Sequence, residues 1–205
     1  MNAKSLNDAL LSISKLMGQH RDYLVELDAQ NGDGDLGISM SNGYAAVADY
    51  MSAAKETDLG KLMMKASGVF NEAAPSSLGT ITAFGMMGMA KALKGKTQAS
   101  LEETAQAMDA GIRLIMEKAK SKPGEKTILD ALAPAVEALK AQAASNDKKA
   151  AFAAAAQAAE QGSESTKAMR SVHGRAAYYG DKSIGLLDGG SVVGKLIFQG
   201  ILASL

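Results

Sequence analysis

Residues 6–37 read LNDALLSISKLMGQHRDYLVELDAQNGDGDLG, an apolar pattern of helical period that runs into an acidic, glycine-rich loop. Apolar side chains recur at Leu6, Leu10, Ile13 and Met17, and the pattern continues as far as residue 27. Glycine and aspartate then interrupt it, as they do where a helix ends in a turn. The first element that we expect is therefore an amphipathic helix that ends at an acidic loop.

Helical spacing returns along the rest of the chain. Good helix formers dominate the composition, and runs of β-branched residues are nearly absent. Ser100-Leu101-Glu102-Glu103 has the form of a capping box, and Pro134 is expected to kink the helix that contains it. We predict an all-α fold in one domain, residues 1–205, with about eight helices: 6–27, 38–51, 59–72, 78–93, 101–121, 128–141, 147–169 and 192–205.

Composition excludes several classes of protein. The 205 residues include no cysteine, which rules out a disulfide framework, a thiolate zinc site and a cysteine nucleophile. The 22 basic and 22 acidic side chains balance, whereas non-specific nucleic-acid binding relies on a basic excess. No run of about 18 apolar residues suggests a membrane helix, and the first residues do not resemble a signal peptide. We expect a cytoplasmic protein with no nucleic-acid or membrane partner.

The acidic loop is the segment with the clearest chemical character. Asp28, Asp33 and Asp35 bring three carboxylates into eight residues, where they repel one another unless a cation or solvent screens them. Oxygen donors without nearby cysteine or histidine favour Mg²⁺, Mn²⁺ or Ca²⁺. A metal held by carboxylates often carries phosphates on its other side, so a magnesium nucleotide is the natural ligand to test. An ordinary solvated turn is the alternative that these residues leave open.

Three other motifs do not fit. A calcium-binding EF-hand that starts at Asp28 would need a glutamate where Ser39 stands. Gly32-x-Gly34-x-x-Gly37 matches the dinucleotide fingerprint formally, but no strand precedes it and two aspartates lie within it. Gly95-Lys96-Thr97 resembles the end of a P-loop, yet Ala90 occupies the position of the required upstream glycine.

Three blocks of the chain form one pattern: Asp28-x4-Asp33-Gly34-Asp35-Leu36-Gly37, Pro123-Gly124-Glu125-Lys126-Thr127-Ile128-x-Asp130 and Gly174-Arg175-Ala176-x-Tyr178-x-Gly180-x-x-Ser183-Ile184-Gly185-x-x-Asp188. Together they resemble one known family, the L subunit of bacterial dihydroxyacetone kinase (DhaL). The resemblance covers nearly the whole chain and implies a barrel of about eight antiparallel, amphipathic helices with a nucleotide at one end.

The resemblance also implies which residues form the site. The three aspartates would hold two Mg²⁺ ions against the phosphates of bound ADP or ATP. No catalytic nucleophile or base is expected from this chain, because phosphoryl transfer asks mainly for positioning and charge neutralisation. The nucleotide would lie along Leu36, Gly37, Ile38 and Ser39, with its phosphates at Ala73 and Ala74, its adenine at Ala119 and Ile128, and Arg175, Asp188, Gly189 and Gly190 completing the pocket.

Two partners follow from the same resemblance. A multiphosphoryl M subunit (DhaM) of the phosphoenolpyruvate phosphotransferase chain would rephosphorylate the bound ADP. A K subunit (DhaK), which holds dihydroxyacetone, would receive the γ-phosphoryl group. A homodimer is left open.

Departures from the family pattern support a second hypothesis. Leu36 replaces a usual histidine, and Asp188-Gly189-Gly190 replaces Asp-Pro-Gly. Residues 71–74, Asn-Glu-Ala-Ala, replace the Gly-Gly-Ala-Ser of the phosphate turn and offer fewer free amides to an anion. The alternatives are therefore a non-catalytic regulatory or partner-binding relative, and a plain divalent-metal buffer. Outside the resemblance, His20 and His173 are expected to be structural or exposed, and Lys126-Thr127 to begin a helix.

Overall fold

A computed structural model of the protein describes residues 1–145 and 147–205. Within these ranges the regular secondary structure is helical, apart from one isolated bridge between Asn2 and Gln98. The predicted all-α fold class is confirmed. The helices are α1 (Ala3–Gln19), α2 (Arg21–Asp28), α3 (Leu36–Ala53), α4 (Leu59–Ala73), α5 (Ser77–Ala92), α6 (Leu101–Ala119), α7 (Leu129–Ala141), α8 (Lys148–Ser165) and α9 (Gly189–Ala203), with 3₁₀ helices η1 (Thr166–Ala168) and η2 (Arg175–Ser183).

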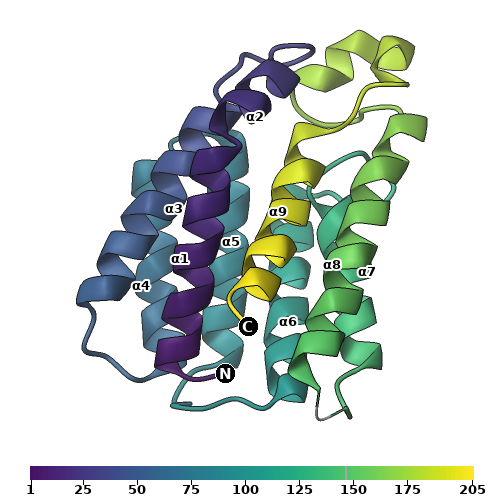
Figure 1. The fold of residues 1–205 in the computed structure, drawn as a ribbon. Coiled ribbons are helices and arrows are strands. Elements are labelled where there is room, and N and C mark those ends of the chain that lie inside the picture. Colours follow the sequence, from purple (N-terminus) through teal and green to yellow (C-terminus); the bar gives the residue numbers. More distant parts are fainter. Residues whose placement is uncertain (146) are drawn as a thin grey trace.

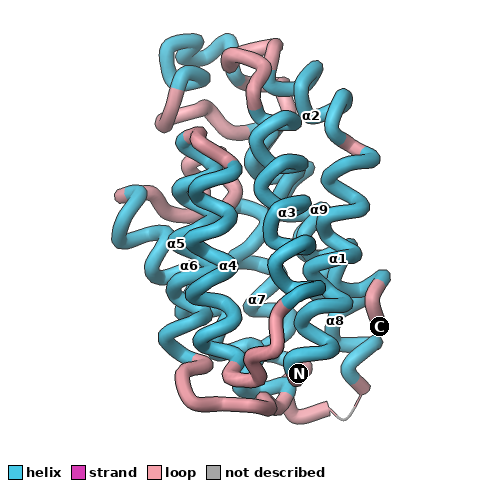
Figure 2. Tube along the Cα trace, turned by 90° about the vertical axis from the view of Figure 1, so that its left-hand side faces the viewer, coloured by secondary structure: helices cyan, strands magenta, loops and turns pink. Residues whose placement is uncertain are grey.

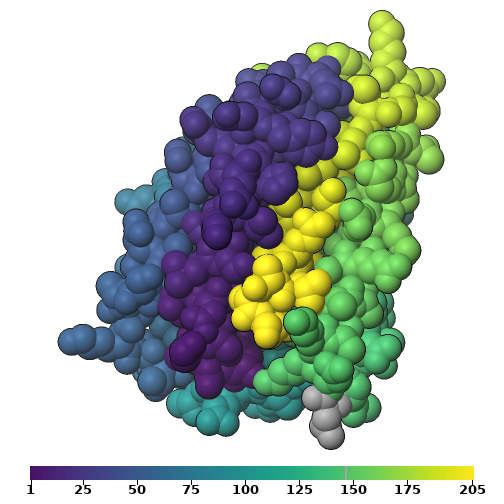
Figure 3. Space-filling view, in the orientation of Figure 1, coloured from purple at the N-terminus to yellow at the C-terminus, as the bar shows by residue number. Residues whose placement is uncertain are grey.

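The long helices run up and down beside one another, and their loops gather at the two ends of the bundle (Figures 1 and 2). Most neighbours in sequence also pack together, as α4 does with α5, α5 with α6 and α7 with α8. The last helix, α9, packs against both α1 and α8, and Figure 3 shows α1 and α9 side by side on one face. The first and last helices therefore close the bundle into a barrel.

The structure differs from the sequence prediction in two places. The helix expected over residues 6–27 is two helices, α1 and α2, because the backbone of His20 between them leaves the helical range at φ −103° and ψ 10°. The helix expected over residues 147–169 ends as α-helix at Ser165 and continues as η1, and the longer η2 lies between residues 169 and 192, where no helix is expected. Both differences lie near one end of the barrel.

Burial of apolar side chains fixes α3 against α4. Tyr44 is 2% exposed, and its ring meets Phe70 edge-on with the centroids 4.9 Å apart. Gly43 lies where any larger residue would strike the Phe70 ring, since a Cβ there would be 2.7 Å from its nearest atom.

An apolar cavity of about 180 Å³ lies within the barrel core. In the described part of the chain, no helix is both long enough and apolar enough to cross a membrane.

The alternation of helix direction brings four helix N-termini to one end of the barrel, the upper end in Figure 1. Helices α3, α5, α7 and α9 begin there, and α2, α4, α6 and α8 end there. Residues 166–188, which we call the cap segment, join α8 to α9 at this end (Figure 1). Because a helix N-terminus carries a partial positive charge, four of them together make this end favourable for an anion.

Candidate functional site

Three carboxylates meet in the loop between α2 and α3. Asp28 is the last residue of α2, Asp35 is the N-cap of α3, and Asp33 lies between them. One carboxylate oxygen from each lies within 4.8 Å of those of the other two. The backbone turns at Gly34, whose φ of 77° suits glycine and whose N–H donates to Asp28 Oδ2 at 2.8 Å. The loop thus gathers the three predicted metal ligands, which we call the acid cluster.

The acid cluster retains excess negative charge. Burial, together with the carboxylates of Asp33 and Asp28, raises the pKa of Asp35 above its usual range, and the guanidinium of Arg175 opposes this shift. Arg175 Nη2 lies 2.7 Å from Asp33 Oδ2, so one cation faces three carboxylates. The donors are all oxygens, and they fit a hard divalent cation such as Mg²⁺.

The start of α3 leaves backbone donors available beside the acid cluster. Its N-cap Asp35 makes no side-chain hydrogen bond to the first turn. At the start of α5, by contrast, the hydroxyl of Ser76 accepts from the N–H of Gly79 at 3.1 Å. The hydroxyl of Ser39 lies 3.0 Å from that of Ser76 and so links the first turns of α3 and α5. Uncapped N–H groups at a helix start are suited to bind phosphate oxygens.

The start of α9 forms another wall of the site. Asp188 caps this helix by accepting from the N–H of Ser191 at 2.6 Å. Burial raises the pKa of Asp188 to about 7; the nearby carboxylates of Asp130 and Asp28 add to the shift, while the Ser191 N–H and Lys126 oppose it. Gly190 lies against the start of α7, where a Cβ would be 3.3 Å from the backbone nitrogen of Ile128.

The predicted nucleotide residues lie at the same end of the barrel, but many of their side chains point inward. Leu36, Ala74 and Ile128 are at most 6% exposed, so any contact from them would be made largely by backbone. The side chain of Leu36 packs against Gly189, where a Cβ would be 2.5 Å from Leu36 Cδ2. Of the remaining predicted residues, the structure leaves Ile38 and Arg175 exposed, buries Gly37 and Ser39, and places Ala73 and Ala119 at the last residues of α4 and α6.

The predicted phosphate turn begins later than its sequence suggested. Residues 71–73 form the last turn of α4, and the change of direction occurs at residues 74–76. Glu72 is exposed on the helix, whereas Ala74 is fully buried. The polar group that the structure places at this turn is the hydroxyl of Ser76, the N-cap of α5.

The sequence did not predict two features, a side-chain contact of His173 and the burial of Lys126. His173, expected to be structural or exposed, has Nε2 2.6 Å from Glu125 Oε2. Lys126, expected to begin a helix, is 3% exposed and adopts a positive φ of 59°. A Pro-Gly turn before Lys126 was the available signal that this lysine departs from regular helix.

The core cavity is distinct from the acid cluster. Its lining is apolar, and none of the three aspartates belongs to it. Among the predicted site residues, Ile128 lines the cavity and also contacts Gly190 at the upper end. Ile128 therefore separates the cavity from the candidate site.

The fold and site define the class of this protein as an all-α barrel with a carboxylate cluster among its helix N-termini. Sequence comparison identifies the family. Residues 30–203 match the DAK2 domain, and the chain belongs to this family. It is 30% identical over 171 residues to the ADP-binding subunit DhaL of the PEP-dependent dihydroxyacetone kinase of Escherichia coli K12, covering 83% of this chain and 81% of the relative. A second such subunit, from Listeria innocua, is 28% identical and covers 100% of this chain and 96% of its own length.

One relative carries the name of another activity, and one solved structure has a similar fold. Human triokinase/FMN cyclase is 31% identical over 94% of this chain, which spans 33% of that protein. The crystal structure of the dihydroxyacetone kinase of C. freundii with AMP-PNP and Mg²⁺ matches with a TM-score of 0.78 and 20% identity, over 100% of this chain and 34% of that one. The chain thus spans about a third of that solved kinase, and this likeness shows the fold.

Proposed function

We propose that this chain is a nucleotide-carrying kinase subunit that binds ADP and ATP with magnesium at the acid cluster. The observation that carries the proposal is the convergence of Asp28, Asp33 and Asp35, with ligand oxygens within 4.8 Å, beside the uncapped start of α3. The name of the E. coli relative includes ADP binding, and the C. freundii kinase was solved with AMP-PNP and Mg²⁺. Both names support a nucleotide as the ligand of this chain.

In this proposal the parts of the site divide the work. The three aspartates hold two Mg²⁺ ions, which would neutralise phosphate charge. The amides at Leu36, Gly37 and Ile38 donate to phosphate oxygens, and Arg175 turns from Asp33 toward the phosphates. The family resemblance places the adenine near Ala119 and Ile128, with residues 188–190 closing the pocket. The chain orients the γ-phosphoryl group and screens its charge, which is most of what phosphoryl transfer requires.

The acceptor is a short ketose held by a partner. We propose dihydroxyacetone on a K subunit, with an M subunit of the phosphotransferase system restoring ATP, because the subunits named among the relatives belong to PEP-dependent dihydroxyacetone kinases. A relative from Pectobacterium atrosepticum, 29% identical over 89% of this chain, is an L-erythrulose kinase. Other short ketoses are therefore the substrates to compare first.

Calorimetric titration of ADP tests the binding step. The protein is stripped of metal and nucleotide, and ADP is added with and without Mg²⁺. Tight binding that requires Mg²⁺ is expected. Absence of binding at millimolar ADP would refute the proposal.

Loss of phosphate contacts favours a second candidate, a regulatory subunit. Leu36 and Ala74 have hydrocarbon side chains with no polar group for phosphate, and both are buried, Leu36 against Gly189. A coupled assay with the K and M subunits separates the two functions. Turnover of the ketose supports the kinase, and nucleotide binding without turnover supports the regulatory role.

A further inference from the structure

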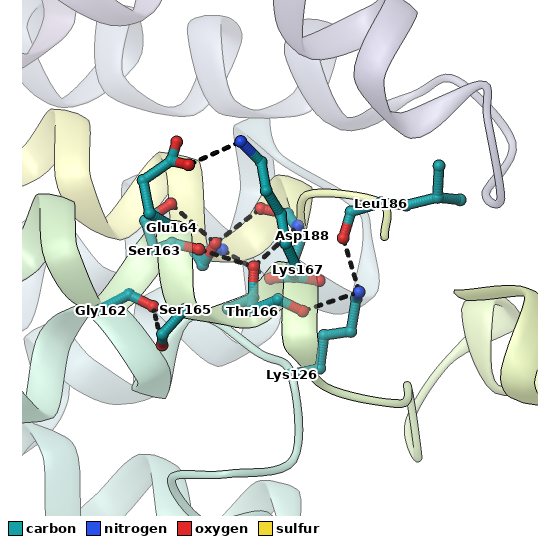
Figure 4. A network of polar contacts seen from close by, with 10 residues as sticks. Lys126, Gly162, Ser163, Glu164, Ser165, Thr166, Lys167, Leu186 and Asp188 are labelled. Atoms are coloured by element: carbon teal, nitrogen blue, oxygen red, sulfur yellow. Dashed lines mark hydrogen bonds and ion pairs between the residues drawn. The ribbon is translucent and has the colours of Figure 1, made fainter. Parts of the chain in front are cut away.

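Lys126 places its ammonium group among backbone carbonyls of the cap segment. Lys126 Nζ lies 2.9 Å from the carbonyl oxygen of Thr166, 3.2 Å from that of Met169, 2.7 Å from that of Ser183 and 2.6 Å from that of Leu186. Figure 4 shows the side chain reaching the carbonyls of Thr166 and Leu186. A compact ammonium with three donors suits this arrangement better than a planar guanidinium.

These four carbonyls come from the two ends of the cap segment. Thr166 and Met169 lie where the cap segment leaves α8, and Ser183 and Leu186 lie where it returns to α9. The ends also bond to each other directly, as the N–H of Gly185 donates to the carbonyl of Lys167 at 2.7 Å. Lys126 therefore hydrogen-bonds both ends of the cap segment to the turn before α7.

The turn that carries Lys126 is itself fixed. Asp130, in the first turn of α7, accepts from the N–H of Gly124 at 2.5 Å and from that of Thr127 at 2.7 Å. Thr166 and Ser183 are fully buried, so their carbonyls would lose a protein partner without reaching bulk water if the ammonium were removed. Lys126 is thus a rigidly held hydrogen-bond donor to the cap segment.

The cap segment carries residues that face the acid cluster. Arg175 lies within the cap segment and pairs with Asp33, and Asp188 is the last residue of the segment. The N–H of Asp188 donates to the hydroxyl of Thr166 at 3.1 Å, so the anchored end continues into the start of α9. Movement of the anchored ends would displace both Arg175 and Asp188.

We propose that Lys126 is a positioning residue that holds the cap segment over the acid cluster, so that Arg175 and Asp188 face the bound nucleotide. This inference rests on the nucleotide-binding function proposed above. The lysine acts through the carbonyls that it binds and makes no contact with the reacting phosphates.

Hydrogen exchange of the nucleotide-free protein tests the holding role without requiring any ligand. Lys126→Ala should speed amide exchange in residues 169–188 by about tenfold or more, and leave exchange in α1 to α6 unchanged. Lys122→Ala is the matched control, because it removes an exposed lysine from the same turn. Equal exchange in Lys126→Ala and the wild type, or a uniform rise in every helix, would overturn the proposal.

Chemical rescue separates positioning from general damage. Lys126→Ala leaves the space of n-propylammonium, which should restore slow exchange in residues 169–188, whereas uncharged n-propanol should not. Failure of the amine to change exchange would count against the role of the ammonium. If Lys126→Ala does not fold, Lys126→Met keeps the volume of the stem and must show the same local rise in exchange.

Titration of ADP in Mg²⁺ tests the functional consequence. Lys126→Ala should weaken binding about tenfold or more, with recovery in n-propylammonium, and Lys122→Ala should match the wild type. If the wild type binds no ADP, the proposed function fails. The hydrogen-exchange result still tests whether Lys126 holds the cap segment. Faster exchange with unchanged affinity would overturn the positioning role and leave the nucleotide function standing.

Discussion

The guanidinium of Arg175 lies 2.7 Å from the carboxylate of Asp33, which joins the cap segment to the acid cluster. The two residues are far apart in sequence, and the arginine side chain is 69% exposed while that of the aspartate is 41% exposed. An exposed pair of this kind contributes little stability, about 0–1 kcal/mol. Its importance lies in competition, because a metal ion and Arg175 both interact with the same carboxylate.

Arg175→Ala should therefore change two affinities in opposite directions. Without its competitor, the acid cluster should bind Mg²⁺ alone about two- to fivefold more tightly. Binding of ADP in the presence of Mg²⁺ should weaken by about tenfold or more, because a charged hydrogen bond to phosphate is lost. Calorimetry with each ligand measures both effects. Arg170→Ala is the control on the same segment, and a parallel change of both affinities would contradict this role for Arg175.

Asp33→Asn should abolish magnesium-dependent nucleotide binding while the barrel stays folded. The amide keeps the size of the side chain but removes the charge that binds the cation, so the dissociation constant for ADP with Mg²⁺ should rise more than about a hundredfold. Glu26→Gln makes the same change of charge at an exposed position of α2 and should have no such effect. Unchanged ADP affinity in Asp33→Asn would exclude the acid cluster as the metal site.

The sequence predicted the acid cluster because its three ligands lie within one short loop, where local spacing and glycine content nearly determine the geometry. Arg175 and Asp188 lie far along the chain, and they were predicted only through resemblance to a family. The role of Lys126 could not be predicted from the residues, because its partners are backbone carbonyls 40 to 60 residues away. Every residue has such a carbonyl, so tertiary contacts of this kind leave no pattern in the sequence.

Asp188 should make the stability of the protein depend on pH. Its pKa is about 7 in the folded protein and 3.8 as an ordinary aspartate, so the folded state binds the proton more tightly. Its contribution to stability is therefore complete below pH 3.8 and is lost as the pH rises through 7. Asp188→Asn keeps a capping side chain without the titration.

Urea unfolding of the wild type and Asp188→Asn, in the absence of metal and nucleotide, measures this contribution. The free energy of unfolding of the variant, minus that of the wild type, should grow between pH 5 and pH 8.5, across the folded-state pKa of about 7. A difference that stays constant over this range would show that Asp188 titrates as an ordinary exposed aspartate.

Two glycine-to-alanine changes should affect stability with opposite signs. Gly79 is buried in the first turn of α5, where a Cβ would overlap the backbone carbonyl oxygen of Ala74. Backbone cannot move aside cheaply, so Gly79→Ala should lower the free energy of unfolding by about 2 kcal/mol or more. It should also disturb the contact between Ser76 and Ser39, and with it the affinity for magnesium and ADP.

Gly68 is the matched control for this change. It lies on the exposed face of α4 with no neighbour within 4 Å of an added Cβ. Gly68→Ala should raise the free energy of unfolding by about 0.5–1 kcal/mol, because alanine loses less backbone entropy in a helix. Chemical denaturation of both variants checks the signs. If Gly79→Ala were as stable as Gly68→Ala, the close approach of α5 to the turn at residues 74–76 could not be a constraint on the site.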